Sequence, residues 1–365
     1  MNRRHLLPAL AALLFSAAAA AQQPWLIGQS APLSGGNARF GNDVRDGAAA
    51  MFAAINAAGG VAGRPIELIT LDDANDRKKA GANTAVLLKE RGVIALFGYG
   101  SATLSLDALP QAEAAGVPFF APFSGAAPVR VKSPVLFTVR ASYAEELEKM
   151  LAFWTRLGMK RVTVVHYDDE VGRQNLEVVA AYLKKIELAP QAFAIRRNAS
   201  LGPADLQRLI DQKPEVLMNT VLSGPAAQIV KGLHERGLFV PTSSLSFVGA
   251  EQFIQAAGAA AAGVSIAQVV PSPTQPIPAV QACARALQAA GVKTPMNTTH
   301  LEACFGAQIL AEGLRRAAKT GTARALRDAL ANLGSHDLGG FTVRFRPADQ
   351  HGSSFVELAM VTRDG

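Results

Sequence analysis

The sequence predicts an α/β protein made of two lobes, each with a parallel-sheet core covered by helices. The first observation is that short apolar runs alternate with longer segments of helical period, which is typical of parallel sheets. The second is that this alternation runs to about residue 140 and then begins again. The third is length: 365 residues less a leader of 21 leaves 344, about two domains at ~100–200 residues each.

In the first lobe, a helix is expected over residues 43–58. Val44, Ala48 and Phe52 recur there at helical spacing, and two glycines follow as a stop signal. The other elements alternate with one another in the same way. Strands are expected at 26–29, 66–71, 93–97 and 117–120, and helices at 78–91 and 104–115.

The second lobe repeats this rhythm after a strand at 137–140. Helices are expected at 145–157, 173–186, 203–211 and 226–236, and strands at 162–166, 191–195, 216–221, 245–248 and 264–269.

The remaining chain begins with a proline-rich connection and differs in pattern from both lobes. Helical stretches near 279–290, 301–318 and 323–331 are followed by β-rich runs at 340–345 and 355–361. The two runs are expected to pair as a hairpin around residues 349–352. This tail has three helices with no strand between them and then two strands with no helix between them. Such a pattern does not build a new α/β lobe, which indicates that the tail adds to the two lobes that precede it. The chain then crosses between the lobes several times, which predicts a hinge.

The N-terminus has the composition of a secretory signal peptide, with MNRRH followed by 16 uncharged residues that end in alanines. This run is shorter than the ~20 apolar residues of a membrane span. We expect cleavage after Ala21 and export of the mature chain. Two of the positive charges in the net +7 belong to Arg3 and Arg4, and the rest are interspersed with acids. Such a surface disfavours a nucleic-acid partner.

No catalytic or metal-binding motif occurs in the sequence. It contains no G-x-S-x-G elbow, no H-E-x-x-H pair and no P-loop, so we expect neither an enzyme nor a cofactor. The two cysteines, Cys283 and Cys304, lie in the exported part, where a disulfide is permitted. The sequence leaves open whether they are bonded or are two buried thiols.

Candidate ligand-binding residues follow the first-lobe strands, because sites in parallel α/β sheets lie beyond the carboxyl ends of strands. Tyr99, Gly100, Ser101 and Thr103 come directly after the strand at 93–97. The glycine allows close approach of the backbone, and the hydroxyls could bind a carboxylate. The same hydroxyls could instead only cap the helix that follows.

Three other loops offer candidates. Phe123, Ser124 and Gly125 follow the next strand, and Phe40 ends a loop long enough to overhang a cleft. The acidic run 168–170 at a second-lobe strand end could meet a cation or form a solvated turn.

Several motifs together resemble the leucine/isoleucine/valine-type solute-binding proteins of bacterial ABC importers. In chain order they are PLSGGNARFG, INAAGGVAGRPIEL, LDDANDRKKA, FGYGSATLS, VPFFAPFSGA and VVHYDDEVGRQN. The resemblance implies a type I periplasmic-binding fold, with two Rossmann-like lobes joined by a three-crossover hinge and closing on a ligand between them. It also implies a monomer in the periplasm that delivers a small carboxylate ligand to an inner-membrane ABC permease.

The resemblance also divides the chain between the lobes. Lobe one takes residues 24–140 plus 272–337, and lobe two takes 141–271 plus 338–365. A sensory partner of the same fold and an exported enzyme are the alternative functions.

Site residues follow from the resemblance by position. The lobe-one loops at Ser101 and Phe123–Gly125 hold the ligand carboxylate, while Phe40 and Tyr99 make side-chain contacts. The lobe-two contacts fall on Val171 and Leu222, and the acid that receives a ligand ammonium aligns near Ser246 or Phe247. Because neither of these is acidic, we expect a small organic acid with an apolar body rather than a branched-chain amino acid.

Overall fold

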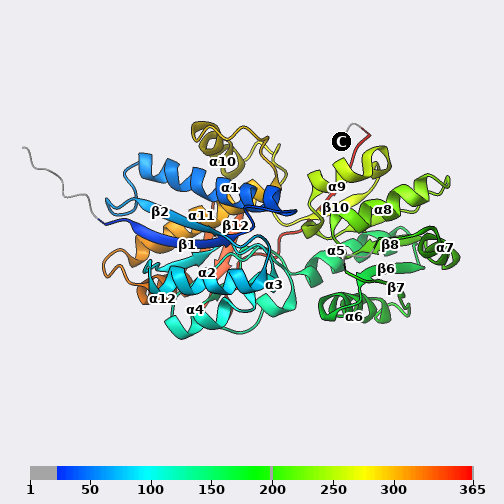
Figure 1. Ribbon diagram of the computed structural model, residues 1–365, viewed down its shortest axis with the longest axis horizontal. Coiled ribbons are helices and arrows are strands. Elements are labelled where there is room, and N and C mark those ends of the chain that lie inside the picture. Colours follow the sequence, from blue (N-terminus) through cyan, green and yellow to red (C-terminus); the bar gives the residue numbers. More distant parts are fainter. Residues whose placement is uncertain (1–22, 198–199, 364–365) are drawn as a thin grey trace, which may run out of the picture.

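The computed structural model describes residues 23–197 and 200–363, which form two α/β lobes lying end to end (Figure 1). The predicted fold class is confirmed. The expected leader at residues 1–21 lies outside the described residues. Within the described ranges, no helix combines the length and the apolar character that a membrane span requires.

Lobe one is built on a parallel sheet with the strand order β2-β1-β3-β4-β5. Its strands are β1 (Trp25–Ala31), β2 (Ile66–Asp72), β3 (Ala95–Phe97), β4 (Phe119–Phe120) and β5 (Leu136–Phe137). β3, β4 and β5 are fully buried, as expected for parallel strands with helices on both faces.

Helices from both ends of the chain cover this sheet. They are α1 (Ala38–Ala57), α2 (Arg77–Lys89), α3 (Ala102–Ser105), α4 (Leu109–Ala115), α10 (Pro278–Ala289), α11 (Thr298–Ala317) and α12 (Ala323–Ala331), with a 3₁₀ turn η1 (Ala127–Val129). The single helix expected at 104–115 is divided into α3 and α4. Pro110 lies in the first turn of α4, where its missing N–H is tolerated, and so the chain starts a new helix there.

The core of lobe one joins α1 to α11, which are distant in sequence. Gly47 of α1 lies against the backbone of α11, because a Cβ there would come within 2.4 Å of the His300 carbonyl oxygen. α11 is also bonded to α10 by the disulfide between Cys283 and Cys304, whose Cα atoms are 6.0 Å apart. The sequence left open whether the two cysteines are bonded, and the structure shows that they form a disulfide between two neighbouring helices.

Lobe two has a six-stranded sheet with the order β13-β10-β9-β8-β6-β7, in which only β13 is antiparallel to its neighbour. Its strands are β6 (Val162–Tyr167), β7 (Gln191–Ile195), β8 (Val216–Asn219), β9 (Thr242–Ser244), β10 (Ser265–Gln268) and β13 (Glu357–Met360). Its helices are α5 (Tyr143–Arg156), α6 (Glu170–Lys184), α7 (Pro203–Asp211), α8 (Ser223–His234) and α9 (Ala250–Ala257), with the 3₁₀ turns η2 (Ser246–Val248) and η3 (Gly258–Ala261).

The strand expected at 245–248 is instead the earlier strand β9, followed by η2. The serines of β9 are buried, and their hydroxyls have hydrogen-bond partners inside the lobe. The Trp154 indole nitrogen donates to the Ser243 hydroxyl at 2.6 Å, and Ser244 accepts from Asn219 at 2.9 Å. Apolar content alone therefore misplaced this strand.

The expected hairpin near the C-terminus does not form. β12 (Thr342–Phe345) pairs with β11 (Gly334–Asp337), whereas β13 pairs with β10 in the other lobe. Val343 and Phe345 of β12 belong to the core of lobe one. Val343 and Phe345 thus pack with lobe one, beyond the change of lobe expected at residue 338.

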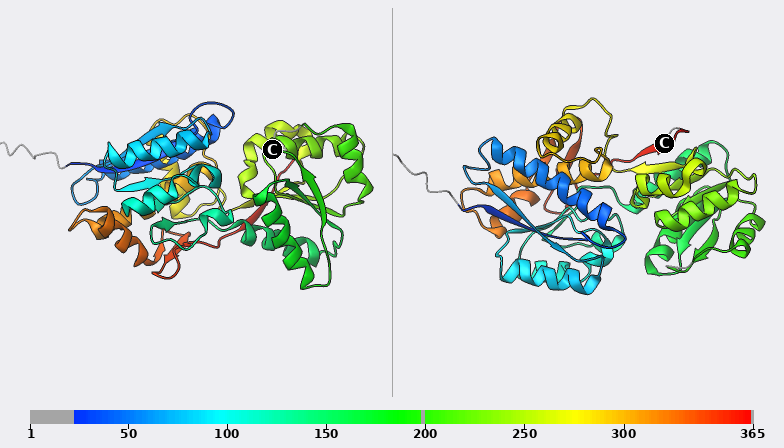
Figure 2. Two further views of the ribbon diagram at one scale, coloured as in Figure 1. Left: turned by 60° about the horizontal axis from the view of Figure 1, so that its bottom comes forward. Right: turned by 45° about the horizontal axis from the view of Figure 1, so that its top comes forward.

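Three connections in the described chain join the lobes, between β5 and α5, between β10 and α10, and between β12 and β13 (Figure 2). The first and third run together. Thr138 donates its N–H to the Gln350 carbonyl at 3.0 Å, and its own carbonyl accepts from Gly352 at 2.7 Å. The lobes are thus linked by paired extended segments, which can bend while each lobe stays intact.

Candidate functional site

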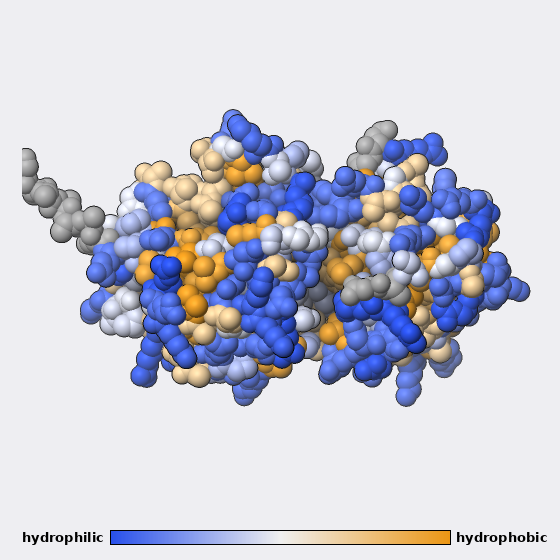
Figure 3. Space-filling view, in the orientation of Figure 1, coloured by the Kyte–Doolittle hydropathy of each residue, from blue (hydrophilic) through white to orange (hydrophobic). Residues whose placement is uncertain are grey.

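A cavity of about 430 Å³ lies between the two lobes, and Figure 3 shows the molecule hollowed there. It is lined by loops that follow the carboxyl ends of β1, β3 and β4 in lobe one and of β6, β8 and β9 in lobe two. Ligands of open α/β sheets bind at such strand ends.

A second hollow, of about 620 Å³, lies on lobe two. Its lining includes Thr242 at the amino end of β9 and Val264 just before β10. This is the sheet edge opposite to the strand ends that carry ligand sites, so we assign the candidate site to the cavity between the lobes.

Most of the predicted ligand-binding residues line the cavity between the lobes. They are Phe40, Gly100, Ser101, Thr103, Phe123, Ser124, Val171, Leu222 and Ser246. Tyr99 and Gly125 are not among the lining residues.

Ser101 caps α3, because its hydroxyl oxygen accepts from the Leu104 N–H at 3.2 Å. The hydroxyl hydrogen is still available to donate into the cavity. Ser124 similarly accepts from the Ala126 N–H at 3.2 Å and lies 3.3 Å from the Tyr143 hydroxyl. Both serines therefore combine local capping with a place on the cavity wall, so the two roles that the sequence suggested are compatible.

The lobe-one wall also carries an aromatic pair. The ring of Phe40, from α1, meets the ring of Phe123 edge to face with centroids 5.9 Å apart. Both line the cavity, which gives this wall an apolar surface beside the two serines.

Tyr99 corrects a prediction. Its ring is fully buried in lobe one against Phe119, at 4.8 Å between centroids, and its hydroxyl is 2.7 Å from the Thr84 hydroxyl. Burial raises the pKa of this phenol. Tyr99 thus supports the loop from behind and makes no contact with the cavity.

Gly125 also has a packing role. A Cβ at this position would come within 2.8 Å of the Ala141 carbonyl oxygen and 2.7 Å of the Tyr143 ring. The absence of a side chain lets the loop lie directly against the first crossover.

On lobe two, Val171 lies in the first turn of α6 and Leu222 just before α8. Tyr167, at the end of β6, also lines the cavity, and its hydroxyl accepts from the Leu222 N–H at 3.2 Å. The Arg197 guanidinium stacks over this ring at 4.0 Å. No local pattern in the sequence marks Tyr167 or Arg197 as site residues, because only the fold places them beside the cavity.

Residues 168 and 169 of the acidic run form a bend and Glu170 begins α6, and none of the three lines the cavity. Asp169 caps α6 by accepting from the Gly172 N–H at 2.9 Å, and it also accepts from Arg197 at 3.0 Å. Asp168 pairs with Arg173 at 3.6 Å. The expectation that this run could meet a cation of the ligand is therefore not supported, because its side chains lie away from the cavity.

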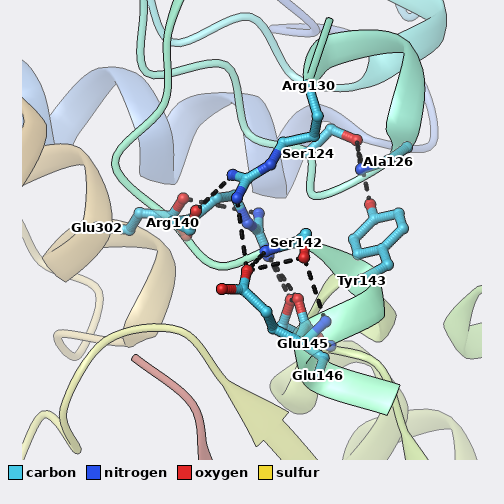
Figure 4. Close-up of polar contacts among 10 residues, drawn as sticks. Ser124, Ala126, Arg130, Arg140, Ser142, Tyr143, Glu145, Glu146 and Glu302 are labelled. Atoms are coloured by element: carbon cyan, nitrogen blue, oxygen red, sulfur yellow. Dashed lines mark hydrogen bonds and ion pairs between the residues drawn. The ribbon is translucent and has the colours of Figure 1, made fainter. Parts of the chain in front are cut away.

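A buried ion cluster of Arg140, Glu146 and Glu302 lies at the floor of the cavity, where Arg140 and Glu302 line the wall and Glu146 lies behind them (Figure 4). Arg140, on the first crossover, lies 3.6 Å from a carboxylate oxygen of Glu146 on α5 and 3.6 Å from one of Glu302 on α11. It also donates to the Ser246 hydroxyl. The cluster therefore connects both lobes to a crossover.

Burial is the largest influence on the pKa of both carboxyl groups in this cluster. Desolvation raises the pKa of Glu146 and of Glu302, and the Arg140 charge opposes that rise in both. The sequence carries one faint sign of this cluster: Glu302 is the only charged residue in the stretch from Thr298 to Leu310.

Among the described residues, no three His, Cys, Asp or Glu side chains are grouped so as to hold a metal ion. The lining of the cavity offers hydroxyl groups, charged side chains and apolar surface.

Comparisons with known proteins agree with this geometry. The family model of periplasmic binding proteins matches residues 24–365. A solved structure of a possible leucine/isoleucine/valine-binding protein from Rhodopirellula baltica is 25% identical, with a TM-score of 0.88, and covers 94% of this chain and 95% of that one. A substrate-binding periplasmic protein from Ralstonia solanacearum is 29% identical, with a TM-score of 0.85 over 93% of this chain and 98% of that one.

Among curated proteins, an amino acid binding protein from Pseudomonas aeruginosa is 26% identical over 220 residues. That alignment covers 58% of this chain and 58% of the relative, so the chain spans little more than half the length of that protein. The chain belongs to the periplasmic binding protein family, and the resemblance to its leucine/isoleucine/valine-type members is confirmed.

Proposed function

We propose that this protein is the periplasmic solute-binding component of an ABC importer and captures a small carboxylate-bearing ligand between its lobes. The observation that carries the proposal is the cavity between the lobes, with serine hydroxyls on one wall. Ser101 and Ser124 donate to the ligand carboxylate. Phe40, Phe123 and Leu222 contact its apolar part.

Closure of the lobes completes the site, because neither wall alone encloses a ligand. Export by the N-terminal leader brings the protein to the periplasm, where the closed monomer presents its ligand to an inner-membrane permease. The protein acts by binding and release and has no catalytic step.

A thermal-shift screen of the mature chain against small carboxylates and amino acids tests this function. A ligand present at 100 times its Kd stabilises the folded state by about 2.7 kcal/mol. The double variant Ser101→Ala/Ser124→Ala serves as the control and should lose the shift. If no carboxylate raises the melting temperature of the wild type, the proposed ligand class is wrong.

Transport is tested separately, by uptake of the identified ligand in cells with and without the gene. Equal uptake by both strains would argue against an importer component, even where binding is confirmed.

A further inference from the structure

Three polar side chains meet where the first and third crossovers pair. Thr138 lies on the first crossover and His351 on the third, and these two residues form an isolated parallel bridge. The Thr138 hydroxyl is 3.0 Å from Nδ1 of His351 and 2.9 Å from Nη1 of Arg130, just after η1. The hydroxyl of Thr138 thus joins a guanidinium to an imidazole at the hinge.

These hydrogen bonds assign the protons at the junction. A guanidinium has donors only, so the Thr138 oxygen accepts from Arg130. The hydroxyl hydrogen is then free to donate to Nδ1 of His351. A ring nitrogen that accepts a hydrogen bond carries no proton, and so the imidazole is neutral when the crossovers are paired in this way.

Protonation of His351 places a second cation beside Arg130. The two nitrogens contact the same oxygen, so they cannot be more than about 6 Å apart, a separation at which like charges affect each other's titration. Burial lowers the pKa of His351, and the Arg130 charge lowers it further. The Arg130 side chain is only 14% exposed, which limits the screening of its charge by solvent.

Two carboxylates oppose this effect, and both have other partners. Glu145 and Asp349 raise the pKa of His351, but less than burial and Arg130 lower it. Glu145 lies 3.4 Å from Arg130 and accepts from the Ser142 N–H at 2.7 Å (Figure 4). Asp349 accepts from the backbone N–H of His351 at 3.1 Å. The neutral ring is therefore the form that suits the paired crossovers.

We propose that His351 makes the hinge sensitive to pH: the neutral ring holds the first and third crossovers together, and the protonated ring releases them. This adds regulation to the proposed function and rests on it where ligand binding is concerned. Released crossovers let the lobes adopt many relative arrangements, of which few enclose a ligand. Apparent affinity falls with the fraction of molecules in the competent arrangement, so acid weakens binding.

The direction of the pH effect follows from the lowered pKa of His351. The paired hinge disfavours the charged ring, so the stabilisation of the pairing is complete above the ordinary histidine pKa of ~6.5. It is lost as pH falls below that value towards the lowered pKa. The crossovers are thus paired at pH 7.5 and partly released at pH 5.5.

Amide exchange of the ligand-free protein tests the hinge directly. The Thr138 N–H donates to Gln350 and the Gly352 N–H donates to Thr138, so both amides report the pairing of the crossovers. Protection factors correct for the intrinsic effect of pH on exchange. We expect them to fall about threefold or more between pH 7.5 and pH 5.5, the order of effect of two like charges at this separation. Unchanged protection of both amides overturns the proposal.

Variants then assign the effect to His351. His351→Gln cannot be protonated but keeps an acceptor for the Thr138 hydroxyl, so its protection factors should be the same at both pH values. Arg130→Gln removes the neighbouring cation, and an NMR titration should then show a higher midpoint for the His351 ring. His300, in lobe one, is another histidine whose pKa is lowered by burial. His300→Gln is therefore the matched control and should keep the wild-type pH response.

Two results would contradict this assignment. If His351→Gln, shown to be folded by its melting curve, keeps the full pH response of the two amides, another group is responsible and the proposal is wrong. An unchanged midpoint of the His351 ring in Arg130→Gln would show that the two cations do not interact.

Calorimetric titration links the hinge to ligand binding. L-leucine and 4-methylpentanoate are titrated at pH 7.5 and pH 5.5, where the carboxylates of both are mostly ionised. A compound that binds should bind wild type about threefold more weakly at pH 5.5, and His351→Gln equally at both pH values. Equal affinity of wild type at both pH values refutes the effect on binding. If neither compound binds, the proposed function loses support, and amide exchange still decides the role of His351.

Discussion

The hydroxyl of Ser124 lies 3.3 Å from the hydroxyl of Tyr143, and so connects a lobe-one loop to the first helix of lobe two. Both residues line the cavity. A ligand that contacts Ser124 therefore lies at the junction of the two lobes.

We predict that Ser101→Ala and Ser124→Ala each weaken ligand binding about tenfold or more. Loss of a hydrogen bond to a charged group costs about 1.5–3 kcal/mol. Calorimetric titration measures the change, and Ser335→Ala, on an exposed position of β11, is the control. Unchanged affinity in both variants would mean that these serines only cap local structure.

Tyr99→Phe should leave ligand affinity unchanged and lower the free energy of unfolding by about 1 kcal/mol. The hydroxyl bonds Thr84 inside lobe one and faces no ligand. Urea denaturation and titration of the same protein measure both quantities. A large loss of affinity with normal stability would place Tyr99 in the binding site after all.

Asp72 should hold in place the loop between β1 and α1, which overhangs the cavity. Its carboxylate accepts from the Leu33 N–H at 2.8 Å and the Ser34 hydroxyl at 2.6 Å, and Pro32 and Asn37 of the same loop line the cavity. We predict that Asp72→Ala raises amide exchange at Leu33 and Ser34 and weakens binding several-fold. Asp76→Ala, which removes only the cap of α2, is the matched control.

The same carboxylate predicts a pH dependence. The Ser34 hydroxyl and neighbouring N–H groups lower the pKa of Asp72 from 3.8 to about 2. A lowered pKa means that the anchoring contribution is complete above the unfolded value and is lost as pH falls towards the folded one. We expect the loop to be released between about pH 4 and pH 2. An NMR titration of the Asp72 carboxyl with a midpoint near 4 would contradict this.

Removal of the disulfide should destabilise lobe one. Cys283 and Cys304 are 21 residues apart in sequence, and a loop of this size corresponds to about 3 kcal/mol in the chain-entropy model. Urea denaturation of the double variant Cys283→Ala/Cys304→Ala measures the loss. Wild-type protein whose disulfide has been reduced is the control and should unfold at the same urea concentration as the variant. Equal stability of the variant and the oxidised wild type would show that the bridge contributes nothing.

Ligand binding should close the lobes about the crossovers. The paired segments at Thr138 and Gly352 can bend without breaking either sheet. Small-angle scattering with and without saturating ligand should therefore show a smaller radius of gyration in the bound state. No change at saturation would remove the hinge from the mechanism.

The sequence by itself determined the two-lobed α/β fold and the lobe-one loops that line the cavity. Local periodicity distinguishes strands from helices, and the carboxyl ends of parallel strands meet at one sheet edge. The lobe-one loops at Ser101 and Ser124 could therefore be assigned to one site before their positions were known, whereas Val171 and Leu222 were assigned only by resemblance to the family.

Only the tertiary structure decided which distant residues share an environment. The residue pattern of β12 does not show whether it pairs with β11 or with β13. It pairs with β11 because Val343 and Phe345 are buried in the core of lobe one. Arg140 and Ser246 are 106 residues apart, and the isolated charge of Glu302 does not show which residues it would meet. Because the strength of an ion pair depends on burial and distance, and both arise from long-range packing, the charge at the floor of the cavity could not be inferred from the chain alone.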